Sequence, residues 1–376
     1  MKAKIFVVIV LGLLSVSVTR SANAMAYEVT ELNPVLFLNG GSYEPAALPQ
    51  GINNAGQVVG TTPIGYPVIW NGVVPTSLGG QGYAYAINNA GQVVGVQGYT
   101  ATRWSGSITT PPLSPLPEAV YSIARGINDN GQVAGTSQGY TANGTLYGNA
   151  VIWNGGTPTA LSTPSGSGSS AAYAINNSGQ VVGVINGFGA TIWNSGVPTA
   201  LPGGSVAIAI NNAGQVLGYG NNGPSVMLWS GGTATNLGMF SATGINNAGQ
   251  VVGYSVTDNG SVLNAVLWEN GTLLDLNNLL DSSGAGWTLW EATAINDLGQ
   301  IVGAGFVDGG SPTNGELSAF LLTPCDTCVA VPYSGINFGV SGTPLPATLP
   351  LFATGLGALG LFGWRRKRKN AAIAAA

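Results

Sequence analysis

The sequence contains no histidine, and only 6% of its 376 residues are charged. Without an imidazole, the chain cannot form a Ser-His-Asp or Cys-His catalytic arrangement or a histidine-ligated metal site, which excludes most hydrolase and zinc mechanisms. A glycosidase mechanism stays open because it requires only two carboxylates. We therefore expect no cofactor and no resident metal.

Basic residues are scarce and unevenly placed. Of the ten, three lie in the first 20 residues and five form the run 365–369, so only Arg103 and Arg125 lie in between. All fourteen acidic residues lie in that same interval, and two bases against fourteen acids give it a formal charge of −12. Because nucleic-acid binding depends on neutralising phosphates with Lys and Arg, nucleic acid is excluded as a partner.

The N-terminus has the three parts of a secretory signal peptide. Two lysines precede the apolar run 5–14, and a stretch of small residues follows it. Cleavage is expected after Ala24 or Ala26, so that residues 1–26 are removed. The apolar run is too short for a transmembrane anchor to be the preferred interpretation. The chain is therefore expected to be exported.

A second apolar segment, 345–364, lies near the C-terminus, directly before the cations 365–369. Its twenty residues just reach the ~20 needed to cross a bilayer, and the cations would be held on the cytoplasmic side. The sequence therefore predicts a C-terminal transmembrane helix that acts as a stop-transfer anchor. A terminal core helix, the alternative, would leave this glycine-rich segment without a partner.

The order GTPLPATLPLF, TGLGALGLFGW and RRKRK in this region resembles the PEP-CTERM sorting signal of exported Gram-negative proteins. In that family a membrane transpeptidase called exosortase cuts the signal, which begins with a Pro-Glu-Pro triplet. Here leucine replaces the glutamate of the triplet. The resemblance implies a sorting segment at 344–369, a tail at 370–376, membrane anchoring before processing, and an exosortase-like partner. The matching residues are Pro344, Leu345, Pro346, Arg365, Arg366, Lys367, Arg368 and Lys369.

One nine-residue phrase occurs seven times, first as INNAGQVVG at 52–60 and last as INDLGQIVG at 295–303. The opening isoleucines are separated by 35, 40, 48, 35, 35 and 50 residues, which indicates a ring or stack of similar units. Within a unit, pieces of three to six residues are bounded by Gly, Asn, Pro or Ser, as is typical of short strands. The sequence therefore predicts an all-β repeat protein.

The corner of each phrase has the chemistry of a type I turn followed by a G1 bulge. In Asn53-Asn54-Ala55-Gly56, the first asparagine accepts from the backbone two residues on, and the glycine supplies a positive φ. A calcium loop would need several carboxylates, and the corners offer only Asp129 and Asp297, so a structural turn is favoured. The turn glycines are Gly56, Gly91, Gly131, Gly179, Gly214, Gly249 and Gly299.

A tryptophan follows once in each of the first six units. Stacked aromatics could bind a sugar chain, but one large aromatic at the same place in every unit is more simply the filler between neighbouring sheets. We therefore favour packing over binding for this set. Its members are Trp70, Trp104, Trp153, Trp193, Trp229 and Trp268.

The last unit lacks its final short stretch after 319–322, and the segment 27–32 could supply it. A closed ring uses its first strand in this way to complete the last sheet, which leaves no free edge. The sequence therefore predicts a seven-bladed β-propeller over 27–323, with about four strands per blade. A β-solenoid is the alternative because a period of 35 is short for a blade, although a solenoid would more often show a fixed coil length.

The repeated phrase, the aliphatic-Trp segment after it, and the run LLDLNNLLDSSGAGWTLWEATAINDLGQIVG with AFLLTP resemble the HAF family of extracellular repeat proteins. The resemblance covers nearly all of 27–323, and members of this family commonly carry the sorting signal described above. It implies an extracellular repeat protein at the cell surface, and it attaches no enzymatic activity to the repeat.

Acidic residues gather in the last quarter of the repeats, beside Trp287 and Trp290. If a catalytic groove existed we would expect it there, with Glu291 and Asp297 as the candidate pair. A solvated rim that keeps a charge-poor exported protein soluble is the preferred interpretation, so no catalytic residue is assigned. The acids are Asp258, Glu269, Asp275, Asp281, Glu291, Asp297, Asp308 and Glu316.

Cys325 and Cys328 form a lone CxxC just outside the repeats. An oxidising compartment favours a disulfide between them. A thioredoxin-like role would require an α/β pattern, and a zinc site would require two more ligands. We expect residues 324–343 to hold this disulfide and a tether.

Two functional interpretations follow. The first is a non-catalytic surface or matrix protein of a biofilm, an adhesion scaffold that binds exopolysaccharide or a neighbouring protein through the gaps at 136–149 and 254–264. The second is a secreted carbohydrate-active enzyme that uses the C-terminal carboxylates.

Overall fold

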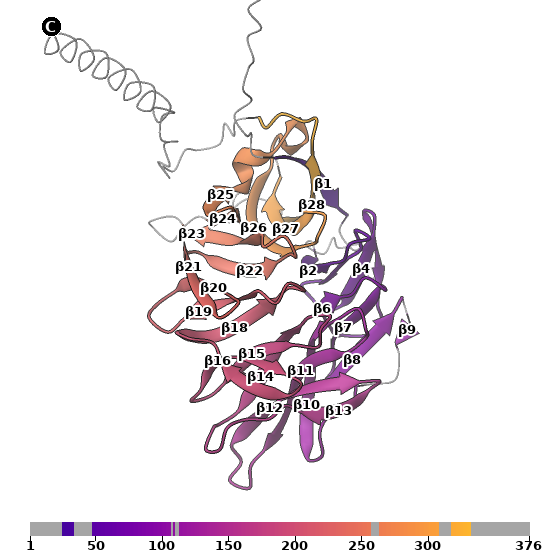
Figure 1. The fold of residues 1–376 in the computed structure, drawn as a ribbon. Helices are drawn as coiled ribbons and strands as arrows, with labels where there is room; N and C mark the ends of the chain where they lie inside the picture. Colours follow the sequence, from indigo (N-terminus) through magenta and orange to yellow (C-terminus); the bar gives the residue numbers. More distant parts are fainter. Residues whose placement is uncertain are drawn as a thin grey trace, which may run out of the picture. The chain divides into compact units, whose positions relative to one another are not determined.

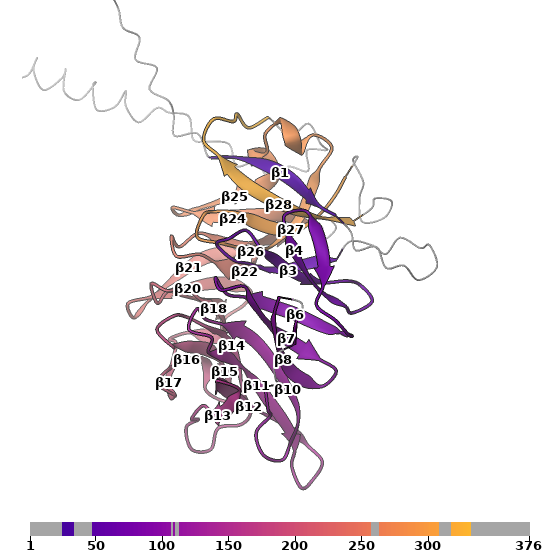
Figure 2. The ribbon, with the colours of Figure 1, turned by 90° about the vertical axis from the view of Figure 1, so that its right-hand side faces the viewer.

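The computed structural model describes residues 25–33, 47–106, 108–109, 113–256, 263–307 and 317–331. In these residues the chain forms seven four-stranded antiparallel sheets and two short 3-10 helices, η1 (Leu276–Leu279) and η2 (Ser282–Gly284). The sheets are the blades of a ring, which Figures 1 and 2 show from two sides. The predicted all-β, seven-bladed β-propeller is confirmed, and the alternative β-solenoid is wrong.

Blades 1 to 6 each consist of four consecutive strands. Blade 1 contains β2 (Leu48–Ile52), β3 (Val58–Thr61), β4 (Pro67–Asn71) and β5 (Val74–Ser77). Blade 2 contains β6 (Gly82–Ile87), β7 (Gln92–Gln97), β8 (Thr100–Ser105) and β9 (Ile108–Thr109). Blade 3 contains β10 (Ala119–Ile127), β11 (Val133–Tyr140), β12 (Leu146–Asn154) and β13 (Thr157–Ala160).

The later blades follow the same order. Blade 4 contains β14 (Ser170–Ile175), β15 (Val181–Ile185), β16 (Gly189–Asn194) and β17 (Val197–Ala200). Blade 5 contains β18 (Gly204–Ile210), β19 (Val216–Gly220), β20 (Ser225–Ser230) and β21 (Thr233–Met239). Blade 6 contains β22 (Ser241–Ile245), β23 (Val251–Val256), β24 (Leu263–Glu269) and β25 (Thr272–Asp275). Blade 7 contains β26 (Thr288–Ile295), β27 (Ile301–Phe306), β28 (Leu317–Cys325) and β1 (Ala26–Leu32).

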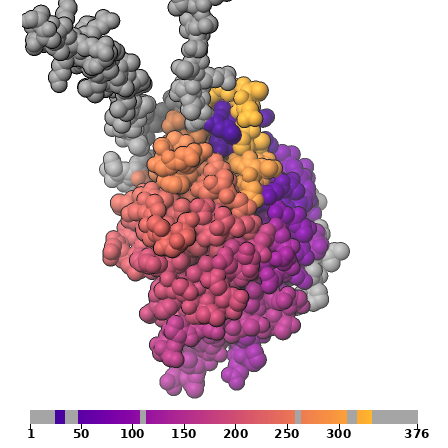
Figure 3. Space-filling model, viewed as in Figure 1, coloured from indigo at the N-terminus to yellow at the C-terminus, as the bar shows by residue number. Residues whose placement is uncertain are grey.

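The strand β1 closes the ring. It pairs antiparallel with β28, from Ala26 opposite Cys325 to Leu32 opposite Ala319. Figure 2 shows the two strands side by side, and the space-filling view in Figure 3 shows the indigo and yellow segments in contact. Tyr27 and Leu32 are each only 1% exposed. The prediction that segment 27–32 completes the last sheet is confirmed.

The hydrophobic core lies between neighbouring blades. One cluster joins Leu32 and Val302 of blade 7 to Val58 and Trp70 of blade 1, and the other blade pairs are packed in the same manner. Trp70, Trp104, Trp153, Trp193 and Trp229 are at most 3% exposed, so each fills the space between two sheets as predicted. Trp268 differs, because it is only half-buried.

Each innermost strand, which is the first of its blade in blades 1 to 6 and β26 in blade 7, contains a β-bulge two residues before its terminal isoleucine. The bulge brings the innermost strand close to the last glycine of the repeated phrase. A Cβ on Gly95 would overlap the carbonyl oxygen of Tyr83, and the corresponding glycine of every other blade meets the same obstacle. Only glycine fits at this position, which explains the last letter of INNAGQVVG.

Several sequence predictions lie outside the described residues: the leader up to residue 24, the tether beyond 331, the sorting segment 344–369 with its apolar run, and the tail. Within the described part of the chain, no helix has the length and apolarity needed to cross a membrane. The variable segment 136–149, proposed above as a contact surface, is the extended hairpin of β11 and β12. The gap at 254–264 is described only at its ends.

Candidate functional site

The seven corners of the repeated phrase meet at the axis and line a cavity of ≈ 160 Å³. All seven turn glycines there have a positive φ, between 74° and 81°. Two polar layers surround the cavity, one from each of the two residues after the isoleucine. The first layer, the buried asparagine ring, is at most 4% exposed and consists of Asn53, Asn88, Asn128, Asn176, Asn211, Asn246 and Asn296.

Every polar atom of a buried-ring side chain has a partner, as Asn53 illustrates. Its Oδ1 accepts from the backbone N–H groups of Ala55 (3.1 Å) and Gln57 (2.9 Å), while its Nδ2 donates to Gln57 Oε1 (2.8 Å) and to the carbonyl oxygen of Asn88 in the next blade (3.0 Å). The blade-to-blade bond repeats around the axis until Asn296 donates to the carbonyl of Asn53 at 3.0 Å. Seven side chains thereby join seven blades in a circle.

The second layer, the rim ring, forms another circle. The backbone N–H of each member donates to the Oδ1 of the member in the next blade, at 2.7–3.0 Å, and the last member donates back to the first. The rim ring consists of Asn54, Asn89, Asp129, Asn177, Asn212, Asn247 and Asp297.

The two aspartates of the rim ring accept hydrogen bonds from the amides on both sides. Asp129 Oδ2 accepts from the Nδ2 atoms of Asn89 (3.1 Å) and Asn177 (2.8 Å). Asp297 Oδ2 accepts in the same way from its two neighbours, Asn54 and Asn247. Because Oδ1 of each member already accepts a backbone N–H, only a carboxylate offers a second oxygen for the neighbouring amides. The two aspartates therefore join neighbouring members of the rim ring, and their carboxylate oxygens accept hydrogen bonds from protein donors.

The hydrogen bonds of Asp129 predict a pH-dependent stability. Burial raises the pKa of Asp129, but bonds from the Asn89 backbone and from the Asn177 and Asn89 amides outweigh it, so the pKa lies below its ordinary value. A lowered pKa in the folded state adds stability above the unfolded value of about 4, and this stability is lost as the pH falls through the folded value. Asp129→Asn should therefore unfold at lower denaturant than wild type at pH 7, with the difference shrinking by pH 2–3. An equal difference at both pH values would contradict this role.

A cluster of tyrosines lies on blades 2 to 4 and includes bulged residues of the innermost strands. Arg125, the bulged residue of β10, lies between the rings of Tyr85 in blade 2 and Tyr173 in blade 4, with its guanidinium carbon 5.5 Å from each centroid. Tyr83 stacks beside Tyr85, with centroids 6.2 Å apart and planes inclined by 7°. Two tyrosines of blade 2, one tyrosine of blade 4 and the arginine of blade 3 thus converge.

A second group of tyrosines, on blades 2 and 3, is joined by edge-to-face contacts. Tyr99 contacts Tyr121 with ring centroids 5.0 Å apart, and Tyr121 contacts Tyr140 at 6.4 Å. Tyr99 is 71% exposed, and Tyr83 and Tyr140 are about half exposed. We call these residues the tyrosine cluster; its members are Tyr83, Tyr85, Tyr99, Tyr121, Tyr140, Tyr173 and Arg125. The repeat phrase gave no signal for it, because these positions vary from blade to blade.

The candidate catalytic acids do not form a pair. Glu291 and Asp297 lie six residues apart on and just after β26, about 20 Å along an extended strand, whereas glycosidase carboxylates lie about 5–10 Å apart. Burial raises the pKa of Glu291, and Asp297 belongs to the rim ring. Asp275 and Asp281 accept the capping N–H groups of η1 and η2. This separation does not favour Glu291 and Asp297 as a glycosidase pair. Asp258, Asp308 and Glu316 lie outside the described residues.

No family model and no curated protein matches the chain. Among solved structures, it is similar to a puromycin-hydrolysing peptidase of Mycobacterium tuberculosis, at 12% identity and a TM-score of 0.48, over 78% of this chain and 54% of that one. It therefore spans about half the length of the peptidase. It is also similar to a catalytically inactive virginiamycin B lyase from Staphylococcus aureus, at 14% identity and 0.47, over 80% and 100% of the two chains. These likenesses do not bear on what this chain does.

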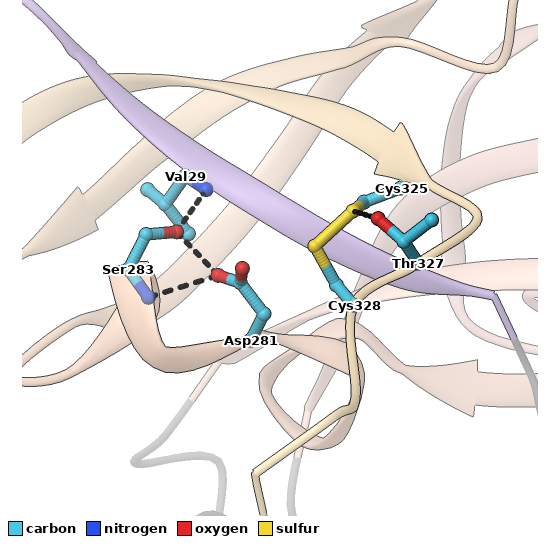
Figure 4. Close-up of a disulfide and its surroundings, with 6 residues drawn as sticks. All are labelled: Val29, Asp281, Ser283, Cys325, Thr327 and Cys328. Atoms are coloured by element: carbon cyan, nitrogen blue, oxygen red, sulfur yellow. Dashed lines mark hydrogen bonds between the residues drawn. A yellow bond between two sulfur atoms is a disulfide. The ribbon is translucent and has the colours of Figure 1, made fainter.

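The two cysteines form a disulfide at the end of β28, next to the closing strand β1. Figure 4 shows a second fastening near β1, where Ser283 Oγ accepts the backbone N–H of Val29 at 2.7 Å and Asp281 accepts the N–H of Ser283 at 2.8 Å. Over the described ranges, no three His, Cys, Asp or Glu side chains are grouped to hold a metal ion. The disulfide and the hydrogen bonds of Ser283 both lie where the ring closes.

Proposed function

We propose that the protein is a non-catalytic, exported repeat protein that binds exopolysaccharide at the cell surface or in the extracellular matrix of a biofilm. The observation that carries this proposal is the tyrosine cluster, whose exposed rings offer faces for pyranose units. Tyrosines are suited to this contact because each combines an apolar ring with a hydroxyl that can bond to a sugar.

The charge around Arg125 supports an acidic sugar as the ligand. Within the described residues, no ion pair or hydrogen bond of its guanidinium is present, and its contacts are the two tyrosine rings. Residues 47–256 contain only Glu118 and Asp129 as acids, against Arg103 and Arg125, so this part of the ring is formally neutral although the chain is acidic. A guanidinium binds a carboxylate in bidentate fashion. A uronate-bearing polysaccharide therefore suits the cluster.

Export and sorting complete the proposal. Residues 1–26 would be removed during export, and residues 344–369 would hold the chain in the membrane of a Gram-negative cell until an exosortase-like enzyme processes them. The hydrogen bonds of the axial rings support a non-catalytic role, because they engage the carboxylates at the centre of the propeller in structure.

A glycan array combined with hydrolysis assays tests this function. The purified chain should bind uronate-bearing glycans without turnover, and Tyr99→Ala and Arg125→Gln should each weaken binding about tenfold or more. Val197→Ala, a change at an exposed residue of blade 4, serves as the control and should bind as wild type does. Turnover that disappears in Glu291→Gln would favour the carbohydrate-active enzyme instead, and an absence of any glycan binding would overturn the proposal.

A further inference from the structure

Trp268 lies beside a cavity of ≈ 370 Å³ between blades 5 and 6. The five equivalent tryptophans are at most 3% exposed, whereas Trp268 is half-buried. Blade 6 is therefore the blade in which the indole of the repeated tryptophan reaches a hollow at the surface. Leu228 of blade 5 lines the same hollow and adds apolar surface, while Gln215, Gln250 and Glu269 add polar groups. The volume lies in the range of small-molecule sites.

Two local differences from the other blades accompany the exposure of Trp268, and the first of them is shared by Trp104. In blades 1, 3, 4 and 5 the indole N–H donates to the carbonyl that follows a buried or half-buried leucine, as Trp193 does to Ser162 at 2.8 Å. For Trp268 the residue in that place is Gly238, whose φ is +109°, and for the fully buried Trp104 it is Gly79, whose φ is +107°. Among the described residues, neither indole donates a hydrogen bond, so this feature alone does not expose Trp268.

The second difference concerns the residue after the tryptophan. In blades 1 and 4 this residue is asparagine, and it accepts from Nε2 of the corner glutamine; Asn194 accepts from Gln180 at 2.7 Å. In blade 6 the residue is Glu269, and the described part of the chain contains no such bond from Gln250. The Oε1 atom of Gln250 is nevertheless fixed in position, because it accepts a hydrogen bond from Asn246 Nδ2 at 2.7 Å. The amide N–H groups of Gln250 are therefore held in place, without an acceptor among the described residues.

Gln215 of blade 5 is held in the same way, since its Oε1 accepts from Asn211 Nδ2 at 2.7 Å. The cavity is thus lined by an aromatic ring, two oriented amide donors and a carboxylate acceptor. We propose that this inter-blade pocket binds one uncharged or amino-bearing pyranose unit of a polysaccharide. The sugar face packs on Trp268, its hydroxyl oxygens accept from Gln215 and Gln250, and Glu269 accepts from a hydroxyl or an ammonium group. The carboxylate disfavours uronates.

This pocket is separate from the tyrosine cluster and does not rest on the proposed function. It includes corner residues of blade 6, whereas Tyr83 and Tyr99 lie at the strand ends away from the corners. The pocket also differs in charge preference: Glu269 disfavours the uronates that Arg125 of the tyrosine cluster would bind. Loss of binding to uronates would therefore leave the pocket untouched, and the reverse holds as well.

Tryptophan fluorescence of the full exported chain tests the pocket. It would be titrated with hexamers of β-1,4-glucose, β-1,4-glucosamine and galacturonate. Binding of the first two should change the emission, and Trp268→Ala should weaken their binding at least tenfold. Glu269→Gln, an exchange that preserves shape, should remove any preference for glucosamine over glucose. Ser230→Ala, the exposed residue after Trp229 one blade earlier, is the matched control and should bind as wild type does.

Three results would overturn the assignment. The first is that the wild-type chain binds neither the glucose nor the glucosamine hexamer. The second is that this binding survives Trp268→Ala unchanged, and the third is a preference for galacturonate that Glu269→Gln does not alter. If Trp268→Ala fails to fold, Trp268→Phe replaces it, because phenylalanine keeps an aromatic face. The question is then decided by whether Glu269→Gln removes the preference for glucosamine over glucose.

Discussion

Replacing Asn128 by leucine should destabilise the propeller by about 3–6 kcal/mol, although the new side chain is of similar size and apolar. Asn128 donates to Gln132 Oε1 and to the Asn176 carbonyl, and its Oδ1 accepts from the N–H groups of Asn130 and Gln132, all at 2.9–3.1 Å. The side chain is 3% exposed. Each buried group left without a partner costs about 1–3 kcal/mol. Urea unfolding monitored by circular dichroism would measure the loss.

Asn154→Leu is the matched control, because it makes the same exchange at an exposed position in the same blade. It should change the free energy of unfolding by about 0.5 kcal/mol or less. If Asn128→Leu were as mild as this control, the buried asparagine ring would not be what joins the blades. Asn128→Asp should also be destabilising at neutral pH, because a carboxylate would face the Asn176 carbonyl and Gln132 Oε1.

The repeated phrase was sufficient to predict the fold and the corner turns, because both follow from short-range chemistry. The spacing of the units predicted seven blades, and the glycine after each Asn-x-x predicted the turn. The lateral bonds of the asparagines could not be predicted, since they join residues 35–50 positions apart whose contact depends on how the blades pack. The second asparagine of the phrase was likewise unexplained until the rim ring was seen.

The candidate sites were less predictable. Glu291 and Asp297 are close in sequence, but Glu291 lies within β26 and Asp297 follows its end, so sequence proximity alone does not make them a catalytic pair. Arg125 and the tyrosines come from three blades, and their convergence depends on the common bulge of the innermost strands. Trp268 looked like its five equivalents because the residue that distinguishes it, Glu269, carries no obvious signal for a pocket.

Removing residues 27–33 should abolish the cooperative unfolding of the propeller or lower its stability by about 5 kcal/mol or more. The strand β1 buries Tyr27, Val29 and Leu32, each at most 9% exposed, and burying such a side chain contributes about 1.5–3 kcal/mol. Its loss would also leave the edge of β28 unpaired and remove the Asn33 carbonyl that accepts the Trp70 indole at 3.1 Å. Typical domains are stable by only about 5–15 kcal/mol.

Single substitutions on β1 test whether its buried side chains contribute stability beyond the backbone pairing of the strand. Leu32→Ala and Tyr27→Ala should each cost about 2–5 kcal/mol, because both side chains are buried between the last and first blades or beneath η1. Glu28→Ala, on the exposed side of the same strand, should be nearly neutral.

The most direct test of ring closure is therefore the urea midpoint of the exported chain with and without residues 27–33, measured under identical conditions. A closed seven-bladed ring predicts that the shortened chain unfolds at much lower urea or without a sharp transition. An unchanged midpoint and an equally sharp transition would show that β1 does not complete the seventh blade.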